Sequence, residues 1–149
     1  MFSSFDPLPA AKKTEIFRVA VEDPNDVIWD LSGDGTRIAY GITSGDLSGV
    51  HRSIYIRNLM QHTTRDIFIA GWPELVSIGW SADGKSLFAS GHTPKGGSLL
   101  HIALDGRVTV LYKAPEPTEV VKASPDGRYV AFGQIISDSN VWLIEGIPQ

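Results

Sequence analysis

The chain has 149 residues, of which 42% are hydrophobic and 20% charged, a composition that can bury the core of one globular domain. Its 13 basic and 17 acidic residues give a formal net charge of −4, which argues against a nucleic-acid binder because such proteins present a basic surface. The sequence has no cysteine, which excludes disulfides and thiol catalysis, and no apolar run reaches the roughly 20 residues of a membrane-spanning helix.

The motif Ser-x-Asp-Gly occurs three times and divides the chain into repeats. It begins at Ser32, Ser81 and Ser124, and each copy precedes a short apolar run. The intervals, roughly 40 to 50 residues, have the length of a four-stranded propeller blade. Short runs rich in Val, Ile, Tyr and Phe alternate with Gly, Pro, Asp and Asn, which is typical of strands and turns. The sequence therefore predicts an all-β fold.

Each repeat is predicted to form one sheet, built in the order inner, second, third and outer strand. The first repeat, 26–70, predicts strands at 26–32, 36–42, 52–59 and 64–70. The second, 75–113, predicts strands at 75–81, 85–91, 98–104 and 107–113. The third, 118–146, supplies strands only at 119–124, 128–134 and 140–145, so its outer strand is missing.

A strand near the N-terminus is predicted to fill that gap in a second copy of the chain. Residues 13–20 follow an N-terminal extension, 1–12, and resemble the outer strand of the first repeat. Three blades do not close a ring, since closed propellers have four to eight, and an open half would expose apolar faces. We therefore expect a half-propeller of three four-stranded blades, closing as a six-bladed propeller in a homodimer with a swapped N-terminal strand.

Asp30 and Lys122 occupy the same place in their repeats, two residues before the motif serine. In a six-bladed ring, the first blade of one chain and the third blade of the other would be neighbours. We therefore expect a salt bridge between these side chains at the junction of the dimer, which charge reversal at Lys122 would weaken.

The stretches WSADGKSLFAS (80–90) and ASPDGRYVAFG (123–133) resemble the TolB-like, WD-repeat-related β-propeller repeats. The stretch DSNVWLIEG (138–146) also resembles the C-terminal propeller of bacterial receptor-like serine/threonine kinases. The resemblance implies a propeller over residues 26–146. By analogy with those kinases it also implies a domain that senses a ligand or a protein partner.

The aspartate and glycine of each motif are interpreted as turn residues. Asp83 can accept backbone N–H bonds and Gly84 can take a positive φ, so the pair closes the hairpin between the inner and second strands. The same interpretation applies to Asp34 with Gly35 and to Asp126 with Gly127. Metal binding by these aspartates is the alternative, which the recurrence at every predicted hairpin disfavours.

The candidate ligand site is expected on the propeller face where the loops that join the second strand to the third strand of each blade emerge. Its candidate residues are Asp46 and His51 in the first such loop, His92 in the next, and Asp138 beyond the second strand of the third repeat. Imidazoles with carboxylates bind divalent metals such as Zn²⁺ or Mn²⁺, and a bound metal can activate water. His51 and His92 are therefore the candidate metal ligands, and two-fold symmetry would double them around one funnel.

Two functions are compatible with the sequence. One is a non-catalytic ligand- or protein-binding propeller module related to sensor domains, favoured because no catalytic motif is present. The other is a metal-dependent hydrolase of phosphoesters, phosphotriesters or lactones, with its site in the central funnel of the dimer. The expected partners are a second copy of the chain and a small molecule or protein, with no nucleic acid and no membrane. The opening MFSSFDPLPAAKK has no signal peptide, so we expect a cytoplasmic protein.

Overall fold

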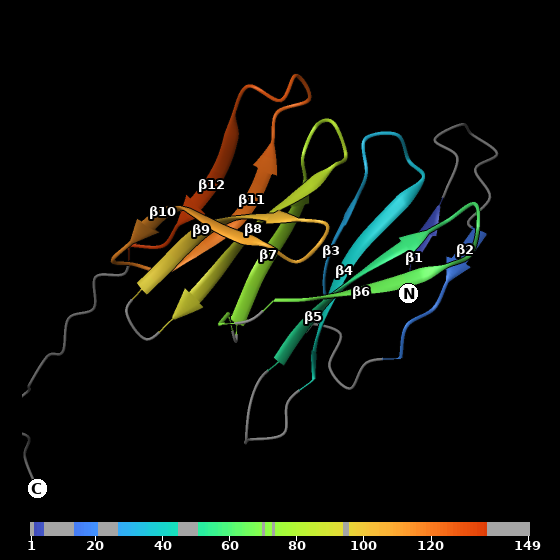
Figure 1. The fold of residues 1–149 in the computed structure, drawn as a ribbon, viewed down its shortest axis with the longest axis horizontal. Coiled ribbons are helices and arrows are strands. Elements are labelled where there is room, and N and C mark those ends of the chain that lie inside the picture. Colours follow the sequence, from blue (N-terminus) through green and yellow to red (C-terminus); the bar gives the residue numbers. More distant parts are fainter. Residues whose placement is uncertain are drawn as a thin grey trace, which may run out of the picture.

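The computed structural model describes residues 2–4, 14–20, 27–44, 51–69, 71–72, 74–93 and 96–136. Within these ranges every regular element is a β-strand, and all strand pairs are antiparallel (Figure 1). In the described part of the chain, no helix is long and apolar enough to cross a membrane. The predicted all-β class is confirmed.

Two four-stranded sheets form the centre of the fold. Sheet 1 contains β3 (Val27–Leu31), β4 (Arg37–Ser44), β5 (His51–Asn58) and β6 (Thr64–Phe68). Sheet 2 contains β7 (Glu74–Trp80), β8 (Ser86–Thr93), β9 (Gly96–Ala103) and β10 (Val108–Ala114). The strands of each sheet follow one another in space as they do in sequence, so each sheet is an antiparallel meander.

Two smaller sheets flank this centre. Sheet 3 pairs β11 (Thr118–Ala123) with β12 (Val130–Gln134), and an N-terminal pair joins β1 (Phe2–Ser4) to β2 (Thr14–Phe17). Figure 1 shows the four sheets side by side in chain order, with the N-terminal pair at one end and sheet 3 at the other. Strand β1 lies in the segment expected to be an extension, and the third strand expected at 140–145 lies outside the described residues.

The main core lies between sheets 1 and 2. Alternating side chains face it, with Ile54 and Ile56 on β5 and Leu100 and Ile102 on β9 at 4% exposure or less. Burying one such side chain stabilises the fold by about 1.5–3 kcal/mol, so this sheet-to-sheet contact is the main source of stability. A smaller cluster lies on the other face of sheet 1, where Phe17 and Val19 pack against Ile38 and Tyr40.

The three Ser-x-Asp-Gly turns have one construction. In the first, the Ser32 hydroxyl donates to Oδ1 of Asp34 at 2.6 Å, and the Arg37 N–H donates to the Ser32 oxygen at 2.9 Å. The turns at Ser81 and Ser124 repeat both bonds. Their glycines take positive φ values: Gly35 +70°, Gly84 +65° and Gly127 +70°. The interpretation of the motif as a turn between the inner and second strands is confirmed.

The carboxylate of Asp30 connects three sheets. Its Oδ2 accepts the backbone N–H of Trp80 at 2.8 Å, and its Oδ1 pairs with the Lys122 ammonium. The Trp80 indole N–H returns a bond of 3.2 Å to the backbone oxygen of Asp30. These bonds hold β3, β7 and β11 together at the inner edges of the sheets.

The salt bridge predicted between Asp30 and Lys122 therefore exists, but it lies within one chain, so its interpretation as a dimer junction contact was wrong. The physical reason is Gly79, which occupies the corresponding place in the second repeat. A Cβ on Gly79 would lie 2.9 Å from the backbone oxygen of Val121 and 3.7 Å from Oδ2 of Asp30. Without that atom, β11 approaches β7 closely and the carboxylate has room beside it.

We expect Gly79→Ala to lower the free energy of unfolding by about 1–3 kcal/mol, because the added methyl would collide with backbone that cannot rotate away. Thermal unfolding followed by circular dichroism would measure the loss. Gly33→Ala is the matched control, since nothing lies within 4 Å of a Cβ there. Equal melting temperatures for the two variants would contradict the role given to Gly79.

Candidate functional site

The structure describes two of the four residues predicted to form a ligand site. His51 opens β5, where its backbone pairs with Ser44, and His92 lies near the end of β8, with its backbone opposite Gly97. In Figure 1 the beginning of β5 and the end of β8 lie toward the same, lower side of the sheets. Asp46 and Asp138 lie outside the described residues. Whether these side chains meet therefore stays a prediction.

His92 holds sheet 3 against sheet 2. Its Nε2 lies 2.9 Å from the backbone oxygen of Thr118, and since a carbonyl oxygen only accepts, Nε2 carries the proton and donates. The Thr118 hydroxyl donates in turn to the backbone oxygen of Ser98 at 3.2 Å, and the Thr118 side chain is fully buried. His92 thus connects the end of β8 to the beginning of β11.

This hydrogen bond limits how His92 could coordinate a metal. With Nε2 donating to Thr118, only Nδ1 could act as a ligand. Among the described residues, no group of three or more His, Asp or Glu side chains is placed to hold an ion. The described geometry does not fit a metal bound through Nε2 of His92, and the roles of His51 and His92 as ligands stay predictions.

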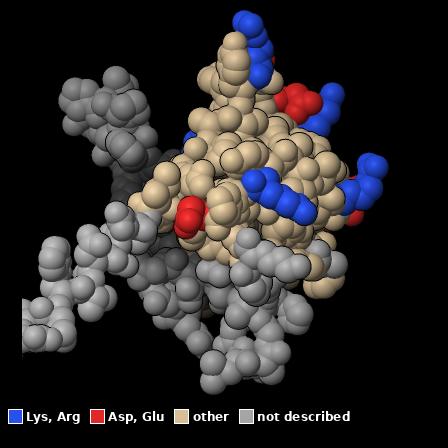
Figure 2. Space-filling view, turned by 90° about the vertical axis from the view of Figure 1, so that its left-hand side faces the viewer, with Lys and Arg blue, Asp and Glu red and all other residues tan. Residues whose placement is uncertain are grey.

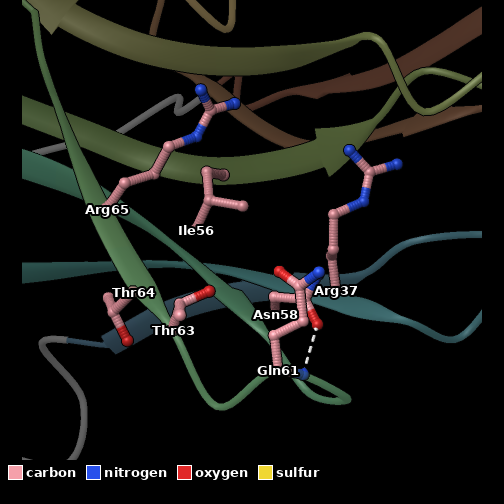
Figure 3. A pocket seen from close by; sticks show the side chains of 7 residues that line it. All are labelled: Arg37, Ile56, Asn58, Gln61, Thr63, Thr64 and Arg65. Atoms are coloured by element: carbon pink, nitrogen blue, oxygen red, sulfur yellow. Dashed lines mark hydrogen bonds between the residues drawn. The ribbon is translucent and has the colours of Figure 1, made fainter.

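A polar cleft that the sequence did not predict lies on the opposite side of the sheets, near the first motif turn. It has a volume of about 280 Å³, and we call it the Arg37/Arg65 cleft (Figure 3). The lining residues come from β4, β5, β6 and the β5–β6 turn: Arg37, Ile56, Asn58, Gln61, Thr63, Thr64 and Arg65.

A tight turn between β5 and β6 shapes one wall of the cleft. Oδ1 of Asn58 accepts the backbone N–H groups of Met60 and Gln61, at 3.0 and 2.8 Å. His62 takes a φ of +56°, which reverses the chain within a few residues. The turn brings Gln61 and the following threonines beside Asn58, which the strand register places opposite Arg37.

Arg37 is held at the boundary between sheets 1 and 2. Its guanidinium carbon lies 4.6 Å from the centroid of a Trp80 ring, a cation–π arrangement. A Cβ on Gly84 would lie 2.6 Å from Nη2 of Arg37, so the second motif turn lies against the same side chain. The nearest described carboxylate is that of Asp34, whose Oδ2 is 3.9 Å away.

Arg65 provides a second positive charge in the cleft. Its side chain is exposed and forms no ion pair with any described residue. Figure 3 shows Arg37 and Arg65 extending to the same side of the sheet, with Ile56 between them. The cleft is therefore positively charged on a chain whose net charge is −4.

The motif aspartates are already occupied by their own turns. The Ser32 hydroxyl and the Thr36 N–H lower the pKa of Asp34 to about 2. The Lys85 N–H and the Ser81 hydroxyl lower the pKa of Asp83, and the Ser124 hydroxyl and the Arg128 N–H lower that of Asp126. These carboxylates are ionised acceptors within the turns, as a structural role requires.

The fold is similar to solved β-propellers. TolB from Acinetobacter baumannii matches with a TM-score of 0.63 and 16% identity, over 88% of this chain and 31% of that one. A putative TolB from Agrobacterium tumefaciens matches with a TM-score of 0.59 and 24% identity, over 85% and 43%. The β-propeller domain of the Trilobed protease from Pyrococcus furiosus gives 0.54 and 19%, over 71% and 33%. No family model and no curated sequence matches the chain.

These likenesses define the chain as a β-propeller segment. More narrowly, its fold is that of the TolB-like propellers, which confirms the resemblance carried by the repeated motif. The chain spans less than half the length of each of these structures. The likeness to the propellers of receptor-like kinases stays a prediction.

We expect Ser32→Ala to raise the pKa of Asp34 toward its ordinary value near 4, because the Ser32 hydroxyl is the largest cause of the lowering. A pKa lowered by folding stabilises the fold above about pH 4, and this contribution is lost as the pH falls toward 2. The variant should therefore lose less stability over that range. An NMR titration of the Asp34 carboxyl carbon measures the shift.

Thr36→Val serves as the control for this titration. It removes a weaker bond to Asp34 and keeps the backbone N–H that also donates. Its effect on the Asp34 pKa should be smaller than that of Ser32→Ala. An unchanged pKa in Ser32→Ala would show that the hydroxyl does not cause the lowering.

Proposed function

We propose that this chain is a non-catalytic TolB-like propeller module, related to sensor domains, which binds a ligand or protein partner and completes its ring by pairing with a second copy. The observation that carries the proposal is the exposure of large apolar side chains at both ends of the stack of sheets. Contiguous exposed apolar surface of this kind marks an interface.

One end is the face of sheet 1 that is turned away from sheet 2. Trp29 and Leu31 on β3 are 55% and 46% exposed there. Farther out, Tyr40 and Tyr55 stack with ring centroids 5.2 Å apart, and Phe17 lies 5.7 Å from Tyr40. Phe17 thus covers the middle of this face, while Trp29 and Leu31 at its inner edge are about half-exposed.

The other end is sheet 3. Val121 is buried against sheet 2, and its N–H donates to the Ser77 hydroxyl at 3.1 Å, so the neighbouring Val120 points the opposite way and is 60% exposed. Tyr129 and Ile136 are exposed nearby. Figure 2 views this end, where uncharged surface lies among Lys, Arg, Asp and Glu side chains that stand mostly along its upper and right-hand margin, with one basic side chain across the middle.

The two ends of the stack differ in the number of strands that the structure describes. Sheet 3 has two described strands, whereas sheets 1 and 2 have four each. On the outer face of sheet 1, Phe17 of β2 packs against Ile38 and Tyr40, which is where the outer strand of a next sheet would lie. Strands β11 and β12 of a second copy would cover Trp29 and Leu31, and β2 would continue that sheet as its outer strand. This arrangement supports the expected strand swap and a six-bladed ring, within the usual range.

No observation on the described residues favours the metal-dependent hydrolase over the binding module. His92 is occupied in holding β11, and the motif aspartates are occupied in their turns. Metal analysis of the purified protein, with phosphoester and lactone hydrolysis measured before and after chelation, would decide between the two functions. Stoichiometric metal with chelator-sensitive turnover would replace the proposal.

Size-exclusion chromatography with light scattering should give twice the mass of the chain. Val120→Lys should shift the protein to the monomer, because a buried and unpaired ammonium strongly opposes association at that end face. Circular dichroism would confirm that the variant still folds.

Met60→Lys is the matched control for this experiment. Met60 is 77% exposed and lies in the β5–β6 turn, outside the strands of both end faces, so its substitution should leave the dimer intact. The pairing would be refuted if the wild-type protein were a well-folded monomer at 100 μM, which is on the order of the concentrations at which weak dimers form.

A further inference from the structure

We infer that the Arg37/Arg65 cleft binds an acidic segment of a protein partner, with one carboxylate at each arginine. The inference names a partner chemistry for the proposed binding function and so rests on it. It does not depend on the pairing of two copies, because every residue of the cleft comes from sheet 1 or its turns.

The strand register separates the two charges. Arg37 lies opposite Asn58 and Arg65 lies opposite Ile56, so the arginines are two strands apart and offset by two residues. With strands about 4.8 Å apart and a rise of about 3.4 Å per residue, their Cα atoms are roughly 12 Å apart. Two acidic groups joined by a short apolar spacer over Ile56 match this arrangement better than a single anion does.

The side chains around the cleft suit carboxylates. A guanidinium presents a planar fork of N–H donors that binds a carboxylate through two parallel bonds. Because Oδ1 of Asn58 accepts the two N–H groups of the turn, its amide NH₂ remains to donate toward the cleft. The Gln61 amide and the Thr63 hydroxyl add neutral polar groups to the wall of the cleft, below Ile56 in Figure 3.

Arg37 is prepared for binding before any partner arrives. Its position over Trp80 and against the second motif turn restricts its rotamers, so less conformational entropy is lost when it binds an anion. Arg65 has no such described contact, so its side chain would lose more conformational entropy on binding. Both arginines should contribute, and Arg65 can be replaced without disturbing any described contact.

The separation of the two arginines and the charge of the chain favour a peptide over other anions. The two Cα atoms lie roughly 12 Å apart, farther than one small anion spans. Nucleic acids need many phosphate contacts, and a net charge of −4 with two arginines in one cleft does not supply them. Two acidic side chains of a protein segment need only the two guanidinium groups of Arg37 and Arg65 as partners.

The test is a fluorescence anisotropy titration at low salt with a labelled extended peptide carrying two glutamates separated by three alanines, a spacing that places both carboxylates on one face of the peptide at about 13.6 Å. The wild-type protein should bind this peptide and should not bind the same peptide with glutamine in place of glutamate. Arg65→Gln and Arg37→Gln should each weaken binding at least fivefold, a factor on the order of one lost charge-assisted bond.

Arg107→Gln is the control for a general charge effect. Arg107 is an exposed arginine that pairs with Asp105 at 2.8 Å in the β9–β10 turn, outside the cleft. Its replacement should leave binding within about twofold of the wild type. Equal losses in Arg65→Gln and Arg107→Gln, or no binding of the glutamate peptide at millimolar concentration, would overturn the inference.

Two further readouts separate the outcomes. Tighter binding of a single-stranded oligothymidine than of the peptide, sensitive to Arg65→Gln, would replace the acidic segment by a nucleic acid. The mass of the wild-type protein is measured in the same samples. A monomer that binds the peptide would overturn the pairing and leave the cleft, whereas a dimer that does not bind it would overturn the cleft alone.

Discussion

The pairing of Asp30 with Trp80 and Lys122 determines how the three main sheets meet. A carboxylate at 17% exposure is costly to bury unless its oxygens are occupied, and here one accepts an N–H and the other a cation. Trp80, fixed by this contact, then provides the ring on which Arg37 lies. The orientation of the Arg37 side chain in the cleft is thus linked to a bond made at the inner edges of the sheets.

The exposure of the apolar side chains shows which sheet faces are covered within one chain. Sheets 1 and 2 bury a continuous layer between them, as in any stack where each unit contacts its neighbours. At the two ends of the stack, Trp29, Leu31 and Val120 remain exposed among the described residues. Their hydrophobic surface is the physical reason to expect another propeller sheet on each end.

Local sequence predicted the turns well, because each Ser-x-Asp-Gly turn is closed by bonds among six neighbouring residues. The Asp30–Lys122 pair could be predicted because the two residues occupy equivalent positions in their repeats. Equivalent positions do not tell how far apart two side chains lie in one chain, and here Gly79, which has no side chain, lets the pair form within the chain. Strand β1 has three residues, too few for a periodic pattern. Arg37 and Arg65 share a face only through the register of three strands, which no motif records.

The repeats agree in their turns and differ in what they present to the next sheet. Arg37 follows the first motif and meets Trp80, whereas the corresponding residues at the boundary of sheets 2 and 3 are Ser86 and Ala123. Of these two boundaries, the one between sheets 1 and 2 has an arginine stacked on a tryptophan ring, and the one between sheets 2 and 3 has no such pair at the corresponding positions. Repetition therefore encodes the propeller, while departures from repetition create the individual surfaces between sheets. A search for function in such a chain gains most from positions where the repeats disagree.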